Sequence, residues 1–245
     1  MSTKDRRRFA ASQLRITRGA LTVAGVQLGL SLVFMLSSGS AKQSIGDWLV
    51  ATPTSVFHEF RVWTLATSVF LELDFLSLLL GLFMLWAFVP TLERFWGTSR
   101  FWRFFAITSV VGTVAGTGLG LLLGRDEPIV GISPFIYASM VAFGIVYAKQ
   151  PVQFFGVLPL TGRQLMYGFI GFLVLYVVLQ QAWDKGAAFA AAMIAAAIMT
   201  SKRASPGLAW KRWRISRARA RLSVIEGGAL GARPKPKKRD EKFLN

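Results

Sequence analysis

Six apolar segments, each near the length needed to cross a bilayer, constrain this chain more than any other feature of the sequence. The hydrocarbon core of a membrane is ~30 Å thick, and a helix needs about 20 mostly apolar residues to cross it. Hydrophobic residues make up 53% of the 245 residues, and charged residues only 17%. The sequence therefore predicts a polytopic membrane protein rather than one or two soluble domains. We expect spans at about 19–38, 75–91, 102–124, 131–148, 164–182 and 186–201.

Nearly all of the net charge lies in the two ends of the chain. Residues 1–18 carry a net charge of +5 and residues 201–245 a net charge of +11, out of +17 for the whole sequence. Basic residues that flank apolar spans are typical of cytoplasmic segments, and anionic lipid headgroups attract them. We therefore predict a basic N-terminal tail over 1–18, a membrane domain over 19–201 and a basic, partly disordered C-terminal tail over 202–245. A basic amphipathic helix is predicted within that tail over 208–225, and we expect no nucleic-acid partner.

The loops between the predicted spans differ in charge. Basic residues follow the second span and the fourth span: Arg94, Arg100 and Arg103, then Lys149 and Arg163. The opposite loops are neutral or slightly acidic. By the positive-inside rule, this distribution predicts six spans with both termini in the cytoplasm. We expect an uncleaved first helix and an integral protein of the cytoplasmic (inner) membrane.

Residue types that support metal or redox chemistry are scarce. The chain has no cysteine and a single histidine, His58. These counts exclude disulfides, thiolate ligands, a cysteine nucleophile and a cluster of histidine ligands. We therefore expect no cofactor and no metal site.

The first outer loop, about 39–74, is amphipathic rather than purely polar. It contains Trp48 and Trp63 among other apolar side chains, a composition that suits the headgroup region. One long span over 62–90 is the alternative, but Glu72 and Asp74 would then lie inside the bilayer, where carboxylates are costly. We therefore expect the second span to begin after Asp74.

Small residues recur at helical spacing in two of the spans. The third span contains Gly112, Gly116, Gly118 and Gly120, and the sixth is rich in alanine from Ala187 to Ala197. Small residues four apart let helix backbones approach closely. The pattern predicts that these two helices pack together near the centre of a compact bundle.

Three stretches, in order along the chain, carry a resemblance to a known family. Arg61-Val62-Trp63-Thr64, with Phe70-Leu71, precedes the second span; Leu92-Glu93-Arg94-Phe95-Trp96-Gly97 follows it; Gly131-Ile132-Ser133-Pro134, with Tyr137-Ala138, opens the fourth. With six spans and a long first loop, this order resembles the rhomboid superfamily of intramembrane serine proteases over about residues 20–200. The resemblance implies an all-α, six-helix rhomboid-like bundle.

The resemblance also implies where the reactive groups of a protease would lie. Ser133 matches the serine nucleophile at the start of the fourth helix, and Gly131 and Tyr137 are pocket candidates beside it. Ser77 and Gly81 occupy the two positions where active rhomboids carry a histidine and an asparagine near the oxyanion, so both are further pocket candidates.

The clearest departure from the rhomboid pattern is the absence of a catalytic base at the expected position. That position on the sixth helix falls near Ala187, Ala188 or Phe189, none of which accepts a proton. A serine without its base is a poor nucleophile. Ser133-Pro134 also fits a structural role, because serine is a preferred N-cap and proline is favoured at the first helical position.

These residues favour a pseudoprotease that binds transmembrane segments of client membrane proteins and affects their folding, sorting or turnover. The first alternative is an intramembrane serine endopeptidase that uses Ser133 with an unconventional base. A small transporter is the second, although such proteins usually carry ionisable residues within their spans. The partners we expect are the lipid bilayer, transmembrane client proteins, and anionic lipid headgroups at the basic tails.

Overall fold

The computed structural model describes residues 16–149, 151–154, 158–201 and 214. The chain separates into two units, Met1–Ser205 and Pro206–Asn245, and every helix and strand named below belongs to the first. The basic N-terminal tail, as far as residue 15, lies outside the described residues. So does the predicted helix over 208–225, apart from Arg214.

Helices lie at all six places where the sequence predicts a span. They are α2 (Arg18–Leu36), α5 (Phe75–Trp96), α6 (Thr98–Leu122), α7 (Ser133–Val146), α8 (Gly162–Gln180) and α9 (Trp183–Thr200). Among the described residues, four of them are long and apolar enough to cross a membrane: α2, α5, α6 and α8. The α7 helix has 14 residues, and α9 carries Asp184 and Lys185 in its first turn. The chain is a mostly helical, polytopic membrane protein.

A short hairpin between α7 and α8 corrects the expectation of an all-α fold. Strands β1 (Pro151–Phe154) and β2 (Leu158–Thr161) pair antiparallel, with Pro151 opposite Thr161. Proline lacks a backbone N–H and interrupts a helix, so Pro151 and Pro159 favour extended chain here. The next helix begins at once, because the Thr161 and Gln164 side chains form a capping box.

The second span is longer than predicted and runs directly into the third. The α5 helix passes through Pro90 to Trp96, and α6 begins at Thr98. Membrane helices tolerate an internal proline where neighbouring groups satisfy the freed carbonyl. Gly97 makes the break with φ of +79°, a conformation that glycine adopts without strain. The expected loop around residues 92–101 is therefore reduced to one residue.

The segment between α2 and α5, which the sequence predicts as an outer loop, contains four short helical segments. They are α3 (Gly39–Leu49), the π-helix η1 (Thr54–His58), α4 (Thr64–Thr67) and the 3-10 helix η2 (Ser68–Phe70). The Trp48 and Trp63 rings stack with 5.6 Å between centroids, and the Trp63 indole donates to the Trp48 carbonyl at 3.2 Å. The α5 helix begins only after Asp74, which confirms that the two carboxylates separate the loop from the span.

The close helix pair that the small residues predict is present. A Cβ on Gly112 would lie 3.0 Å from the Ala188 carbonyl oxygen of α9, and one on Gly116 would lie 2.9 Å from the Ala188 Cβ. Both positions on α6 therefore require glycine for α9 to pack so near. Gly118 differs, because a Cβ there would meet nothing within 4 Å.

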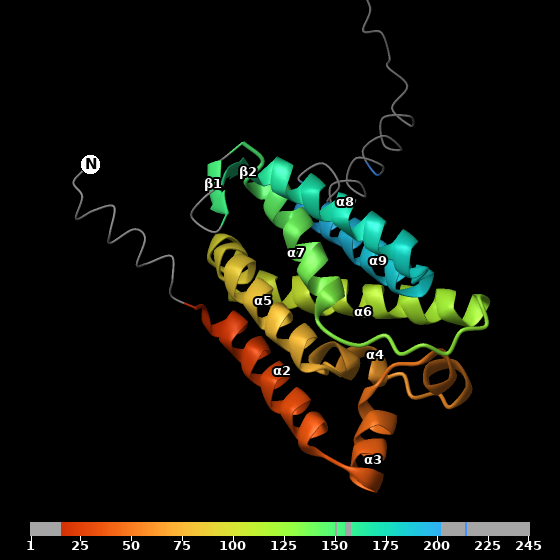
Figure 1. The fold of residues 1–245 in the computed structure, drawn as a ribbon. Helices are drawn as coiled ribbons and strands as arrows, with labels where there is room; N and C mark the ends of the chain where they lie inside the picture. Colours follow the sequence, from red (N-terminus) through yellow and green to blue (C-terminus); the bar gives the residue numbers. More distant parts are fainter. Residues whose placement is uncertain (1–15, 150, 155–157, 202–213, 215–245) are drawn as a thin grey trace, which may run out of the picture. The chain divides into compact units, whose positions relative to one another are not determined.

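The α7 helix forms the centre of the membrane domain. It packs against α5, α6, α8 and α9 (Figure 1), and ten of its 14 residues are buried. In contrast, only four of the 19 residues of α8 are buried. The largest core cluster joins Phe135 of α7 to Phe101, Phe104 and Phe105 of α6. The segment that leads into α7 is thereby anchored on a rigid core.

A buried carboxylate joins the end of α5 to the start of α2. Glu93 is 3% exposed and accepts hydrogen bonds from the backbone N–H groups of Gly19 and Ala20, both at 3.0 Å. The Thr17 hydroxyl donates to it as well, and the Thr98 hydroxyl donates at 3.1 Å. The first N–H groups of a helix have no partner within the helix, so Glu93 caps α2 from a neighbouring helix.

Candidate functional site

Ser133 lies at the first residue of α7 and does not cap it. The N-cap position belongs to Ile132, and Pro134 falls in the first turn. No side-chain hydrogen bond caps this helix among the described residues. The predicted capping role of Ser133 is therefore wrong by one position. The tight turn before it depends instead on Gly131, whose φ is +89°.

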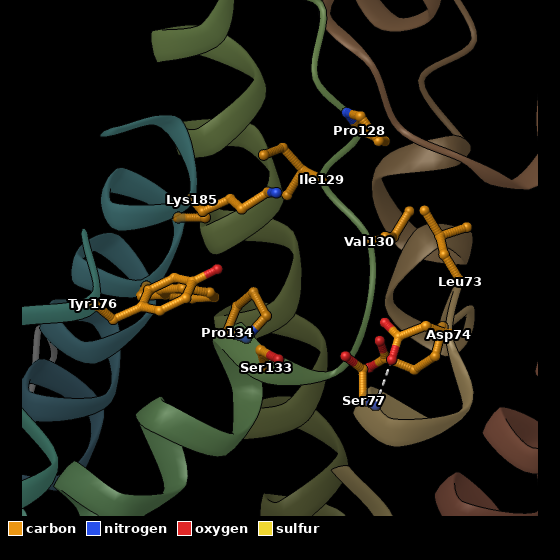
Figure 2. A pocket seen from close by; sticks show the side chains of 13 residues that line it. Leu73, Asp74, Ser77, Pro128, Ile129, Val130, Ser133, Pro134, Tyr176 and Lys185 are labelled. Atoms are coloured by element: carbon orange, nitrogen blue, oxygen red, sulfur yellow. Dashed lines mark hydrogen bonds between the residues drawn. The ribbon is translucent and has the colours of Figure 1, made fainter. Parts of the chain in front are cut away.

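A cavity of about 270 Å³ lies at this end of α7. Its wall is formed by the segments 72–74 and 128–130, by Ser77 of α5, by Ser133 and Pro134 of α7, by Tyr176 of α8, and by Lys185, Ala188 and Phe189 of α9. Figure 2 shows Tyr176 and Lys185 on one side of Ser133 and Pro134, with Asp74 and Ser77 on the other. The cavity therefore lies among four helices, α5, α7, α8 and α9, and the segments that lead into α5 and α7.

The structure brings only some of the predicted site residues into this wall. Ser133 and Ser77 line the cavity, whereas Gly131, Gly81 and Tyr137 do not. Tyr137 packs against Phe189, with 5.0 Å between ring centroids, and belongs to the packing around the core clusters.

Gly131 and Gly81 make room for another side chain, Glu72. A Cβ on Gly131 would overlap the Glu72 carboxylate, lying 2.7 Å from its Cδ. One on Gly81 would lie 3.3 Å from Gln27 Nε2 and 3.8 Å from Glu72 Oε1. These two glycines therefore accommodate the carboxylate and its hydrogen-bond donor rather than a ligand.

The α9 side of the wall offers Ser133 little help in catalysis. Ala188 and Phe189, two of the residues expected where a base would lie, line the cavity and cannot take a proton. Lys185 also lines it, but its Nζ pairs with Glu127 Oε2 at 3.5 Å. His58 ends the η1 helix, between α2 and α5, and lies outside the cavity wall.

Glu72 is the functional candidate that the sequence patterns missed. It is 6% exposed, and its Oε1 accepts from the Ile132 backbone N–H at 3.1 Å and from Gln27 Nε2 at 3.3 Å. Its own N–H donates to the Ser31 hydroxyl at 2.9 Å. Burial raises the pKa of the Glu72 carboxyl to about 7, although the two hydrogen bonds oppose the rise. The signal in the sequence was a carboxylate placed directly before an apolar span.

Asp74 is the second carboxylate in the wall, and it is ionised more readily. Its Oδ1 accepts from the Ser77 backbone N–H at 2.8 Å and so caps α5. The hydrogen bonds from Ser77 hold the pKa of Asp74 below its usual range. The cavity therefore contains one permanent and one titratable negative charge near neutral pH.

No group of three or more His, Cys, Asp or Glu residues that could hold a metal ion occurs in the described part of the chain. Beside six aliphatic residues, the side chains in the wall are two carboxylates, one paired ammonium, two serine hydroxyls and two aromatic rings. This set can bind polar or cationic groups, and it includes no histidine, the usual base of a serine nucleophile.

Comparison with known proteins gives a family for this chain. No curated protein matches the sequence. A family model described as eukaryotic integral membrane protein (DUF1751) matches residues 18–201, from the start of α2 to the residue after α9. Because the match spans the whole membrane domain and most of the chain, the protein belongs to the DUF1751 family of integral membrane proteins.

Proposed function

We propose that this protein is a rhomboid-like pseudoprotease that binds transmembrane segments of client membrane proteins in or beside the cavity at the start of α7. The composition of the cavity wall carries the proposal: Ser133 lies in it, and Ala188 and Phe189 hold the places on α9 where a base would be. Catalysis by serine depends on that base, and the loss of one oxyanion donor alone costs about 10²–10³ in rate. Binding needs neither group.

The position of the cavity suits a membrane-spanning client. It lies between Ser77 of α5 and Tyr176 of α8, at the head of the short α7 helix. At about 1.5 Å per residue, the 14 residues of α7 extend roughly 21 Å, which is less than the ~30 Å bilayer core. A short helix of this kind favours local thinning of the bilayer, and a client helix with polar residues gains a place to pack.

We further propose six crossings with both termini in the cytoplasm, which places the cavity at the outer face. Arg94, Arg100 and Arg103 lie around the junction of α5 and α6, and Arg163 lies at the start of α8. The cavity lies at the opposite helix ends, where the connecting segments are neutral or acidic. The positive-inside rule supports this orientation in an inner membrane.

Site-directed photocrosslinking in nanodiscs tests the proposal directly. A photoreactive residue at Tyr176, in the cavity wall, is compared with one at Ile107, which is 44% exposed on α6 and outside the wall. We expect crosslinks from position 176 to single-span peptides that saturate and that unlabelled peptide competes away. Crosslinks from position 107 should rise in proportion to peptide concentration. Equal, unsaturable crosslinking at both positions would contradict the binding role.

An endopeptidase is the second candidate, because Ser133 lines the cavity and no described residue holds its hydroxyl in a hydrogen bond. Lys185 would be its base only after release from Glu127. Labelling with a fluorophosphonate probe separates the two functions. Labelling that disappears in Ser133→Ala indicates an activated nucleophile, whereas no labelling beside a labelled active rhomboid supports binding alone.

A further inference from the structure

The carboxylate of Glu72 is buried but only half used. Both of its side-chain hydrogen bonds, from Ile132 N–H and from Gln27 Nε2, end on Oε1. Oε2 accepts none from the described residues, and it is not among the fully enclosed polar atoms. Glu72 also lines the cavity, so a ligand there can reach this side chain. A buried acceptor of this kind is costly unless a donor reaches it.

The charges of the cavity wall favour a cation as that donor. Glu72 and Asp74 contribute two carboxylates, and the one ammonium among the described lining residues is that of Lys185. Lys185 is already offset by Glu127, at 3.5 Å. The cavity therefore keeps negative charge that no group within the described fold neutralises.

The rest of the wall fits an ammonium or guanidinium group. The rings of Tyr176 and Phe189 line the cavity, and aromatic faces attract cations. The hydroxyls of Ser77 and Ser133 add acceptors for further N–H donors. A volume of about 270 Å³ is small for a whole ligand pocket, which usually exceeds roughly 300 Å³, but it is adequate for one long side chain.

We propose that this cavity binds the lysine or arginine side chain that a client helix carries near its outer end. The inference rests on the proposed function and names what the cavity recognises in a client. A cationic residue at the edge of a span is unfavourable in the bilayer unless a carboxylate pairs with it. Glu72 and Asp74 would supply that pairing, and the cation would supply the donor that Glu72 Oε2 lacks.

The pH dependence of binding follows from the charges that face Glu72. Asp74 from the same segment is ionised throughout, Gln27 of α2 carries no charge, and Tyr176 and the paired Lys185 face the cavity from α8 and α9. The pKa of Glu72, raised by burial to about 7, makes it the group that gains charge near neutrality. Affinity for a cationic peptide should therefore rise between about pH 6 and 8, while that for a neutral peptide stays constant.

The test uses single-span peptides that are identical except for one residue at the outer end: Lys, Gln or Glu. Binding to the full-length protein is measured in phosphatidylcholine nanodiscs. We expect the Lys peptide to bind at least about tenfold more tightly than the Gln peptide. Glu72→Gln should reduce that preference to about twofold or less, and its folding is verified by thermal unfolding. Asp47→Asn, which removes an outer-loop carboxylate outside the cavity wall, should leave the preference unchanged.

The possible results separate the inference from the function on which it rests. Equal binding of the Lys, Gln and Glu peptides would overturn the cation site and leave client binding intact. A preference that survives Glu72→Gln but falls in Asp47→Asn would assign it to general surface charge and also overturn the site. Displacement of the Lys peptide by phosphatidylethanolamine would make the cavity a lipid site instead. If no peptide binds at all, both proposals fail.

Discussion

The two buried glutamates of the described chain lie at opposite ends of the same span, and they are used in opposite ways. Glu93, one turn before the end of α5, accepts four hydrogen bonds on its two oxygens. Glu72, three residues before the start of α5, accepts two side-chain bonds on one oxygen and presents the other to a cavity. Burial is similar, at 3% and 6% exposed, so burial alone does not distinguish them.

The difference shows what separates a structural carboxylate from a binding one. The donors around Glu93 are the starting N–H groups of α2 and two threonine hydroxyls, and together they use both oxygens. Such a charge is compensated within the fold and has no capacity left for a ligand. Burial raises the pKa of Glu72 to about 7, and its unused oxygen is left to accept from a cation in the cavity.

Replacing each glutamate by the isosteric glutamine tests this comparison. The largest expected effect is the loss of folding stability in Glu93→Gln. In Glu93→Gln an amide NH₂ must face two of the four donors, so we expect a loss of about 3–5 kcal/mol of stability, as when a buried charged network is broken. Glu72→Gln keeps an acceptor oxygen for Ile132 and Gln27 and removes a carboxyl whose ionisation opposes folding, so it should lose no stability at pH 7. Equilibrium unfolding in mild detergent measures both, and equal losses would break the distinction.

The second expected effect is on the pH dependence of folding stability, which should differ between the wild type and Glu72→Gln. The pKa of Glu72 is raised to about 7 in the fold from an ordinary value of 4.5, so its protonated form favours the folded state. That contribution is complete below about pH 4.5 and is lost as pH rises through 7, a total of about 3 kcal/mol. Glu72→Gln should flatten this part of the curve and be more stable than the wild type at pH 8. An unchanged slope in the variant would show that another group titrates.

Alanine substitutions of the glycines beside the two glutamates test the same comparison, with a smaller expected loss of stability. A Cβ on Gly19 would lie 2.7 Å from the Phe101 ring and 2.8 Å from both Glu93 oxygens. Gly19→Ala should therefore cost about 1–3 kcal/mol through overpacking, without changing the pH dependence. Gly131→Ala should cost a similar amount, because of its positive φ and the overlap with Glu72, and should also shift the pH dependence.

The control for both glycines is Gly25→Ala. Gly25 lies within α2, where an added Cβ meets nothing within 4 Å. Thermal unfolding at two pH values measures all three variants, and we expect Gly25→Ala to be neutral or slightly stabilising. A pH shift in Gly19→Ala as large as that in Gly131→Ala would contradict the separate roles of the two glutamates.

Local sequence patterns predicted the helices but not the role of Glu72 in the cavity wall. The six apolar runs locate six helices to within a few residues, because hydrophobicity and helix length act within each segment. The close pairing of α6 and α9 also followed from Gly112 and Gly116, since small-residue spacing is a local signal of packing. The Ser133-Pro134 pair located the start of α7 to within one residue.

Interactions between distant segments explain what the sequence did not predict. The hydrogen bonds to Glu72 come from Gln27, 45 residues earlier, and from Ile132, 60 residues later. Only the folded bundle brings these three residues together. The resemblance to a protease directed attention to Gly131 and Gly81 as pocket residues, whereas both accommodate Glu72 and its donor. The role of Glu93 was hidden in the same way, because three of its four donors lie 73 to 76 residues upstream.

Substitutions of Asp74 should have the smallest effect on stability. They separate the role of Asp74 as a helix cap from its charge in the cavity. Its Oδ1 accepts from Ser77 N–H at 2.8 Å, so Asp74→Ala should cost about 1 kcal/mol, as for other N-caps. Asp74→Asn keeps the cap and removes the charge, so its stability should stay within about 0.5 kcal/mol of the wild type. Hydrogen bonding lowers the pKa of Asp74, so its contribution is present above pH 3.8 and lost as pH falls through the folded value. Unfolding of Asp74→Asn, Asp74→Ala and Glu72→Gln at several pH values around 7 then assigns stability to the cap and the pH response to Glu72. A change in slope near pH 7 in Asp74→Asn as large as that in Glu72→Gln would show that the two carboxylates titrate as one unit.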